Sequence, residues 1–147
     1  MKYTILLLIT TLLIANCCIS QEATSRDVNH EFVVIFPSLK KDALFEKSLQ
    51  WVNRCKSDSV VCDYTDKERG TIVVRNCSMN ILRPDIRMKF TIIFGVNNEN
   101  AQLRFVNLRP ANVNDTVYAI ITAPYHQAAQ EQFKILVKNF TDYVNAK

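Results

Sequence analysis

Glycine is scarce in this sequence, since only Gly70 and Gly95 occur among its 147 residues. Two isolated glycines cannot build a glycine-rich phosphate cradle, and the chain has neither a G-x-G-x-x-G run nor a Walker loop. The H-E-x-x-H and G-x-S-x-G motifs are missing as well. These absences exclude the usual signatures of nucleotide-binding proteins, zinc proteases and serine hydrolases. We therefore expect no cofactor and no metal.

Histidine is equally rare, and the carboxylates form no catalytic pair. His30 lies in a polar N-terminal segment and His126 lies near the start of a predicted helix. A general base needs a fixed geometry and a partner, and neither is visible, so both are predicted to be surface residues. Asp63 and Asp66 flank a predicted hairpin, where acidic residues are typical of a solvated turn.

What is present is an ordinary globular composition. Hydrophobic residues make up 48% of the chain and charged residues 22%, which excludes a wholly disordered or low-complexity protein. The 18 basic and 14 acidic residues give a net charge of +4, which falls to +3 if Lys2 is removed with a leader. The length suits one domain.

The first twenty residues predict an export leader. Lys2 precedes the apolar block 5–14, and small and polar residues follow it. The block is shorter than the roughly 20 apolar residues of a membrane span, so we expect cleavage after Ser20 and a mature chain starting at Gln21. A second route stays open, because Ile14-Ala15-Asn16-Cys17 resembles a bacterial lipobox in which Cys17 would be lipidated. Either route places the protein in the periplasm, the outer envelope or the medium.

Three cysteines remain after the leader: Cys55, Cys62 and Cys77. In an oxidising compartment one pair among them can form a disulfide, and three pairings are possible. The alternative is that all three are small buried apolar residues. Their spacing contains no C-x-x-C, which argues against a metal site.

The pattern predicts a leader at 1–20, a flexible lead-in at 21–30 and one α+β domain at 31–147. A strand is expected at 32–36, followed by a helix capped by Ser38 and running to about Lys56. Its predicted buried stripe consists of Leu44, Phe45, Leu49, Trp51, Val52 and Cys55. Two β-rich runs, 59–64 and 71–75, are joined by the charged turn 65–70 and predict a hairpin.

Strict alternation begins at Met88 and predicts a second hairpin. One face of this strand collects Met88, Phe90, Ile92, Phe94 and Val96, and the run 101–108 returns after the turn 97–100. The stretch 109–123 is ambiguous between a loop and a buried element. Pro124 then opens a long amphipathic helix to about Tyr143. The predicted order is β-α-β-β-β-β-α, an antiparallel twisted sheet with two helices on one face.

The strand 31–37, the helix 41–52, the hairpin 63–73 and the later hairpin 88–108 together resemble a family of exported Bacteroidetes domains of unknown function. That family has a TATA-binding-protein-like fold. The resemblance implies this α+β architecture for residues 31–108 and implies no established activity and no catalytic residues. The sequence departs from the family in its cysteines and at Arg75-Asn76-Cys77, where small, glycine-containing residues are usual.

Two functional hypotheses follow. If both helices cover one sheet face, the other face is free, and Val73, Ile93, Arg104 and Val106 would contribute to a half-apolar outer face. This predicts a non-enzymatic binding module whose partner is an envelope protein or a second copy. Basic residues lie on or near the strands, but export argues against nucleic acid. The alternative is a hydrolase in which a cysteine pairs with His126 or a histidine acts near a helix terminus.

Overall fold

The computed structural model describes residues 30–55, 60–81, 83–111 and 123–146. The predicted leader, Cys17 and most of the lead-in lie outside these residues. Five strands form one antiparallel sheet in the order β1-β5-β4-β3-β2, so the first strand pairs with the last. The elements in chain order are β1 (His30–Ile35), α2 (Lys41–Cys55), β2 (Val61–Asp66), β3 (Thr71–Ile81), β4 (Arg83–Asn97), β5 (Asn100–Pro110) and α4 (Ala123–Asn145).

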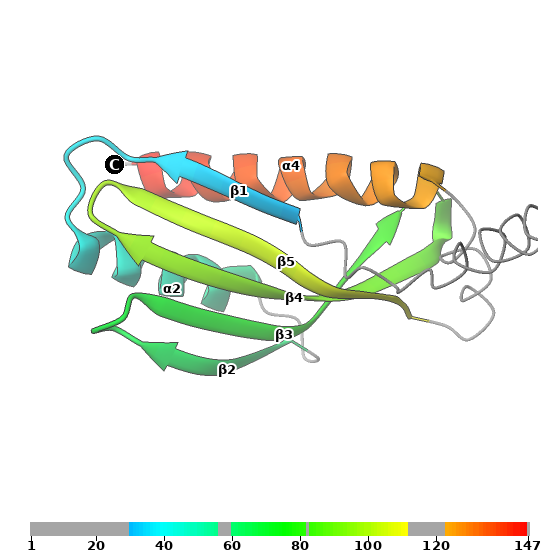
Figure 1. Cartoon of the computed structure of the whole chain (residues 1–147), viewed down its shortest axis with the longest axis horizontal. Helices are drawn as coiled ribbons and strands as arrows, with labels where there is room; N and C mark the ends of the chain where they lie inside the picture. Colours follow the sequence, from blue (N-terminus) through cyan, green and yellow to red (C-terminus); the bar gives the residue numbers. More distant parts are fainter. Residues whose placement is uncertain (1–29, 56–59, 82, 112–122, 147) are drawn as a thin grey trace, which may run out of the picture.

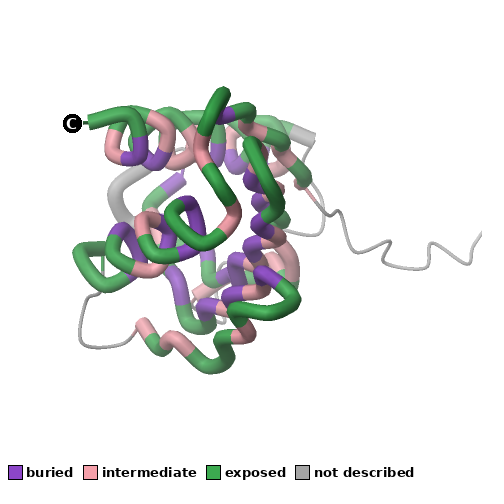
Figure 2. The backbone as a smooth tube through the Cα atoms, turned by 90° about the vertical axis from the view of Figure 1, so that its left-hand side faces the viewer, coloured by how far each residue is buried: buried purple, intermediate pink, exposed green. Residues whose placement is uncertain are grey.

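Both helices lie behind the sheet in Figure 1, and no helix among the described residues covers the opposite face. The predicted order of elements and their α+β arrangement are thus confirmed. Buried and exposed residues alternate along the strands, as Figure 2 shows. This is the pattern of a sheet with one dry face and one wet face. We call the helix-covered side the inner face and the bare side the outer face.

Aromatic side chains fill the space between the helices and the inner face. Phe105 and Phe133 stack with ring centroids 4.1 Å apart, and Trp51 meets Phe140 edge-on at 5.4 Å. The predicted stripe of α2 is buried at Leu44, Phe45, Trp51 and Val52, whereas Leu49 is half-buried and Cys55, at the end of the helix, is exposed. Each fully buried large side chain contributes about 1.5–3 kcal/mol to folding. The core therefore needs no metal or ligand to hold the layers together.

The start of α2 differs from the prediction. Ser38 does not cap the helix, because it has a φ of 71° and its backbone amide donates to Glu99 Oε1 at 3.1 Å. The amide of Lys41 donates instead to Asn98 Oδ1 at 3.0 Å, so the cap comes from the β4–β5 turn. A residue distant in sequence supplies the acceptor that an N-terminal helix amide requires.

Four of the five strands are longer than predicted. β1 already includes His30, which was assigned to the lead-in, whereas β2 keeps its predicted length and lies two residues later, from Val61 to Asp66. β3 continues beyond the predicted end at Arg75 to Ile81, and β4 begins at Arg83 instead of Met88. Cys77, Met79 and Ile81 pack on or against the core and keep the alternation going. β5 reaches Pro110, while most of the ambiguous stretch 109–123 lies outside the described residues.

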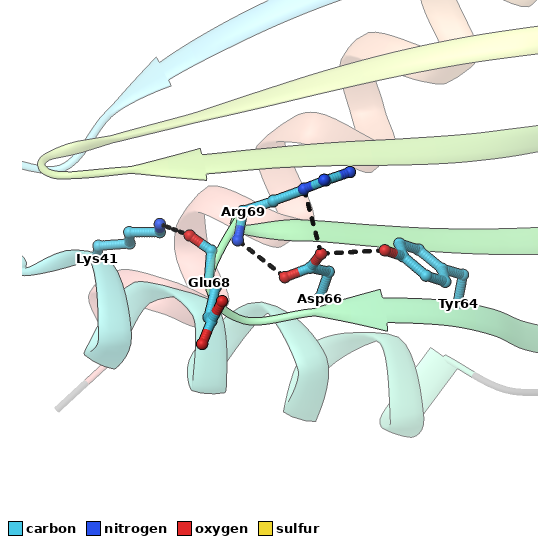
Figure 3. Close-up of polar contacts among 5 residues, drawn as sticks. All are labelled: Lys41, Tyr64, Asp66, Glu68 and Arg69. Atoms are coloured by element: carbon cyan, nitrogen blue, oxygen red, sulfur yellow. Dashed lines mark hydrogen bonds and ion pairs between the residues drawn. The ribbon is translucent and has the colours of Figure 1, made fainter.

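The turn between β2 and β3 is held by the side chain of Asp66 (Figure 3). Its Oδ1 accepts a hydrogen bond from the Arg69 amide at 2.9 Å, and its Oδ2 accepts one from the Tyr64 hydroxyl at 3.0 Å. The bond from the Arg69 amide is the main reason that the pKa of Asp66 lies below its usual value. Lys41 Nζ donates to the carbonyl of Glu68 and so ties the start of α2 to this turn.

Candidate functional site

The outer face brings together the residues predicted for it. Val73 on β3 is opposite Ile93 on β4, and Ile93 is opposite Arg104 on β5, so the three form one row across the sheet. Val106 lies opposite Thr91 near this row. Val73, Ile93 and Val106 are partly exposed and Arg104 is exposed. The predicted set thus forms a patch with apolar side chains and one cation.

Two bulges interrupt the sheet beside this patch. Between Val74 and Cys77, β3 has one residue more than the facing stretch of β4, and β5 has one more between Val106 and Arg109. Asn76 and Asn107 occupy the bulges with φ values of 59° and 56°. Asparagine tolerates this left-handed conformation better than most residues. A bulge bends its strand and redirects its side chains, so β4 is flanked by distortions on both sides.

A hollow of about 460 Å³ opens between the two bulges. Its lining includes three cations, Arg75, Lys89 and Arg109, together with Asn76, Asn107 and the hydroxyl residue Thr91. A second hollow of about 320 Å³ shares Asn76 and Lys89 and adds Arg87. None of the described residues that line either hollow is acidic. This part of the outer face therefore carries concentrated positive charge.

Two of the cysteines line a different cavity, on the inner side of the sheet. Cys55 and Cys77 both line an apolar space of about 280 Å³ next to Trp51 and Leu136, while Cys62 is not part of its lining. The structure draws no disulfide between them; Cys77 is buried and Cys62 half-buried, but Cys55 is exposed, so the alternative of three buried apolar residues is wrong for Cys55. The predicted disulfide stays a prediction, and this shared cavity makes Cys55 with Cys77 the pair to test first.

Cys55 and Cys77 are poorly suited to nucleophilic chemistry. Burial raises the pKa of Cys77 to about 11, and burial also raises the pKa of Cys55. The thiolate is the reactive form of cysteine, so both groups are protonated at neutral pH. Among the described residues, no hydrogen bond joins any cysteine to a histidine.

The histidines lie close to each other, and neither lines the cysteine cavity. The His30 ring packs on Phe133 at 5.3 Å between centroids. Burial lowers the pKa of His30, and the nearby His126 lowers it further. Both were predicted to be surface residues, but each is only partly exposed. Within the described ranges no cluster of three or more metal-ligating side chains forms, and no helix is long and apolar enough to cross a membrane.

A twisted antiparallel sheet with both helices on one side defines a TBP-like α+β domain. Residues 31–110 match the model of a domain of unknown function (DUF4468) with TBP-like fold, and the chain belongs to this family. The resemblance inferred from the sequence is thereby confirmed. The comparison with curated proteins finds no match.

Two solved structures share the fold. A TBP-like protein from Parabacteroides distasonis is 16% identical with a TM-score of 0.64, over 82% of this chain and 95% of that one. A DUF4468 family protein from Bacteroides ovatus is 12% identical with a TM-score of 0.62, over 82% of this chain and 88% of that one. At such identities the likeness establishes the architecture and nothing about ligands.

The sequence did not reveal the hollow. Lys89 and Arg109 were recognised only as basic residues near strands, and Asn76, Thr91 and Asn107 were not singled out as ligand-binding residues. The one available signal was the composition of Arg75-Asn76-Cys77, which departs from the family's usual small residues. Register alone brings Asn76 and Asn107 to opposite sides of β4.

Proposed function

We propose that this chain is a non-enzymatic binding module of the periplasm or cell envelope that meets its partner with the outer face. The proposal rests on the row formed by Val73, Ile93 and Arg104, on a sheet face that neither α2 nor α4 covers. Tyr64 and Val33 extend apolar exposure toward the two sheet edges, with 47% and 58% of their surfaces accessible. An apolar patch with a charged neighbour is typical of a protein-interaction surface.

The compartment follows from the leader. A basic residue, a short apolar block and a small-residue ending support export, and the alternative lipobox at Cys17 supports attachment to a membrane through a lipid. Export removes the chain from the chromosome, so the basic residues are not assigned to nucleic acid. The favoured partner is an envelope protein, and self-association is the other outcome that the experiment resolves.

A cysteine- or histidine-dependent hydrolase is the weaker candidate. The raised pKa values of Cys55 and Cys77 oppose thiolate formation, and His30 and His126 lie beside each other instead of beside a nucleophile. No observation on the described residues favours this activity over binding.

Site-specific photo-crosslinking in the producing cell tests the proposal. A crosslinker at Ile93 probes the outer face, and one at Ile135, which is 51% exposed on α4, serves as the matched control on the other side. We expect position 93 to give a discrete adduct and position 135 to give none. An adduct with the mass of a dimer identifies self-association. Equal labelling from both positions, or no adduct from position 93, would contradict the proposal.

A further inference from the structure

Two of the three cations that line the larger hollow have no ion-pair partner among the described residues. Arg75 forms an ion pair with Asp63 at 3.1 Å. Lys89 and Arg109 have no ion-pair partner among the described residues, although they lie directly opposite each other on β4 and β5. Like charges in directly facing cross-strand positions oppose folding. Two adjacent unpaired cations at this position therefore point to an anion from outside the chain.

Polar groups beside these cations are also left unused. Thr91 is only 9% exposed and lines the hollow, yet its hydroxyl makes no hydrogen bond to any described residue. The hydroxyl oxygen is not fully buried, so it is open to the hollow and available to a ligand. Asn76 and Asn107 line the same hollow from β3 and β5, and their side chains likewise form no hydrogen bond within the described ranges.

The backbone on both sides of the hollow has conformations that are unusual for strands. Asn76 and Asn107 hold left-handed conformations inside strands, and each accompanies an extra residue in its ladder. Strained positions that cluster are characteristic of binding sites. Positions at which the local conformational preference of the sequence disagrees with the fold are expected at functional sites. Strain, like-charge contact and an unpartnered hydroxyl thus coincide in one place.

We propose that the hollow binds a phosphomonoester, with Lys89 and Arg109 as its charge partners and Thr91, Asn76 and Asn107 as hydrogen-bonding groups. A monoester carries a charge of about −1.5 to −2 at neutral pH, which matches the two unpaired cations. Arginine binds phosphate through two parallel N–H donors, and lysine supplies a point charge. The volume of about 460 Å³ exceeds that of a phosphate group and leaves room for a small polar moiety such as a sugar ring.

This inference goes beyond the proposed function and can stand without it, although the hollow opens on the same outer face. The ligand chemistry can come from a soluble sugar phosphate or from a lipid with a phosphomonoester headgroup. Calorimetry with glucose 6-phosphate, with glucose and with inorganic phosphate tests the first source. Co-sedimentation with phosphatidylcholine vesicles, with or without phosphatidic acid, tests the second. Binding in either arm supports the proposal and names the source, whereas binding in neither arm overturns it.

The variants Lys89→Gln and Arg109→Gln test which residues bind the ligand. Each is expected to weaken binding by about tenfold or more, the effect of losing one charge-assisted contact. Thr91→Val removes the hydroxyl at nearly constant volume and is expected to weaken binding without unfolding the protein. Lys138→Gln is the matched control, since its side chain on α4 is 75% exposed. Equal weakening in Lys138→Gln, or equal affinity for glucose and glucose 6-phosphate, would refute a specific site.

Two further outcomes separate the proposals. A DNA oligonucleotide that binds through Lys89 and Arg109 while both monoester arms fail would assign the hollow to nucleic acid and overturn the inference. Phosphate binding without any adduct at position 93 would remove the proposed protein partner and leave the hollow standing. Thermal unfolding of every variant checks that a lost signal reflects the site and not the fold.

Discussion

At the scale of single residues, the most informative positions are asparagines in strands. Asn76 and Asn107 combine strand pairing on either side with φ values near 60°. A residue with a Cβ usually avoids this region, and asparagine and glycine are the common exceptions. The identity of these two residues is therefore explained by backbone conformation before any ligand is considered.

Substitution of Asn107 tests that explanation. Asn107→Ala is expected to lower the free energy of unfolding by about 1–2 kcal/mol, because alanine is strained at positive φ. Asn107→Gly is the matched variant and is expected to stay within about 0.5 kcal/mol of the parent, since glycine adopts this conformation freely. Urea denaturation measures both. Equal stabilities of the alanine and glycine variants would show that the backbone here is not constrained.

His30 makes stability depend on pH. Its pKa in the folded protein is below the ordinary 6.5, so the unfolded chain binds the proton more readily. Stability conferred by the neutral ring is complete above 6.5 and is lost as the pH falls below it toward the folded pKa. We expect His30→Gln to show a shallower loss of unfolding free energy on acidification from pH 7.5 to about pH 5. Parallel pH profiles for the parent and the variant would rule out this role.

At the scale of elements, the β2–β3 turn has a strict requirement for glycine. Gly70 has a φ of 68°, and a Cβ there would lie 2.0 Å from the backbone oxygen of Val96. The carbonyl of Gly70 also accepts a 2.7 Å hydrogen bond from the Val96 amide, which joins the turn to the end of β4. The close approach of two backbones leaves no space for a side chain.

The two glycines of the chain provide a matched pair for this point. Gly70→Ala is expected to reduce the free energy of unfolding by more than about 2 kcal/mol, since backbone must move to relieve the clash. A Cβ on Gly95 would meet only the flexible Gln102 side chain at 3.4 Å, so Gly95→Ala is expected to change stability by less than about 1 kcal/mol. Chemical denaturation measures the free energy of unfolding of both variants. Comparable losses in the two would contradict the expectation that only position 70 lacks space for a side chain.

Elements with a strong apolar period could be predicted from the sequence, and their irregular ends could not. The stripe containing Leu44, Phe45, Trp51 and Val52 and the alternation from Met88 to Val96 are both found buried. The continuation of β3 was missed because Asn76 and Asn80 favour turns, which concealed the alternation of Cys77, Met79 and Ile81. Pairing with β4 outweighs that local preference.

At the scale of the whole molecule, α4 completes the domain. The family match ends at residue 110, but the core takes buried side chains from Tyr125, Ala129, Phe133, Phe140 and Val144 on this helix. Lys47 on α2 also donates from Nζ to the carbonyl of Val144 at 2.6 Å, which links the two helices. The inner face would be open to water over much of its area without α4.

Truncation after Ala111 tests this dependence. The shortened chain is expected to lose cooperative thermal unfolding. Removing several fully buried aromatic and aliphatic residues costs more free energy than the whole unfolding free energy of an ordinary small domain. Near-ultraviolet circular dichroism and tryptophan fluorescence at Trp51 report the loss. A sharp unfolding transition in the truncated chain would show that the family-matched segment folds alone.

The hollow also explains the limit of inference from the sequence at this scale. Lys89 and Arg109 become neighbours only through the β4–β5 register, and Asn76 and Asn107 through two ladders that share β4. No local pattern encodes such a juxtaposition. Fold class follows from periodicity, whereas a site assembled from three strands follows from register.

Because of the two bulges, the hollow that would bind the ligand depends on the lengths of β3 and β5. β3 and β5 each exceed the facing stretch of β4 by a single residue. Deleting that residue from either strand would let the ladder run without interruption and would leave the packing of the inner face in place. A homologue shortened in this way would keep the architecture and present a flat surface. One-residue insertions and deletions in β3 or β5 would thus distinguish the proteins of this fold that bind the ligand from those that do not.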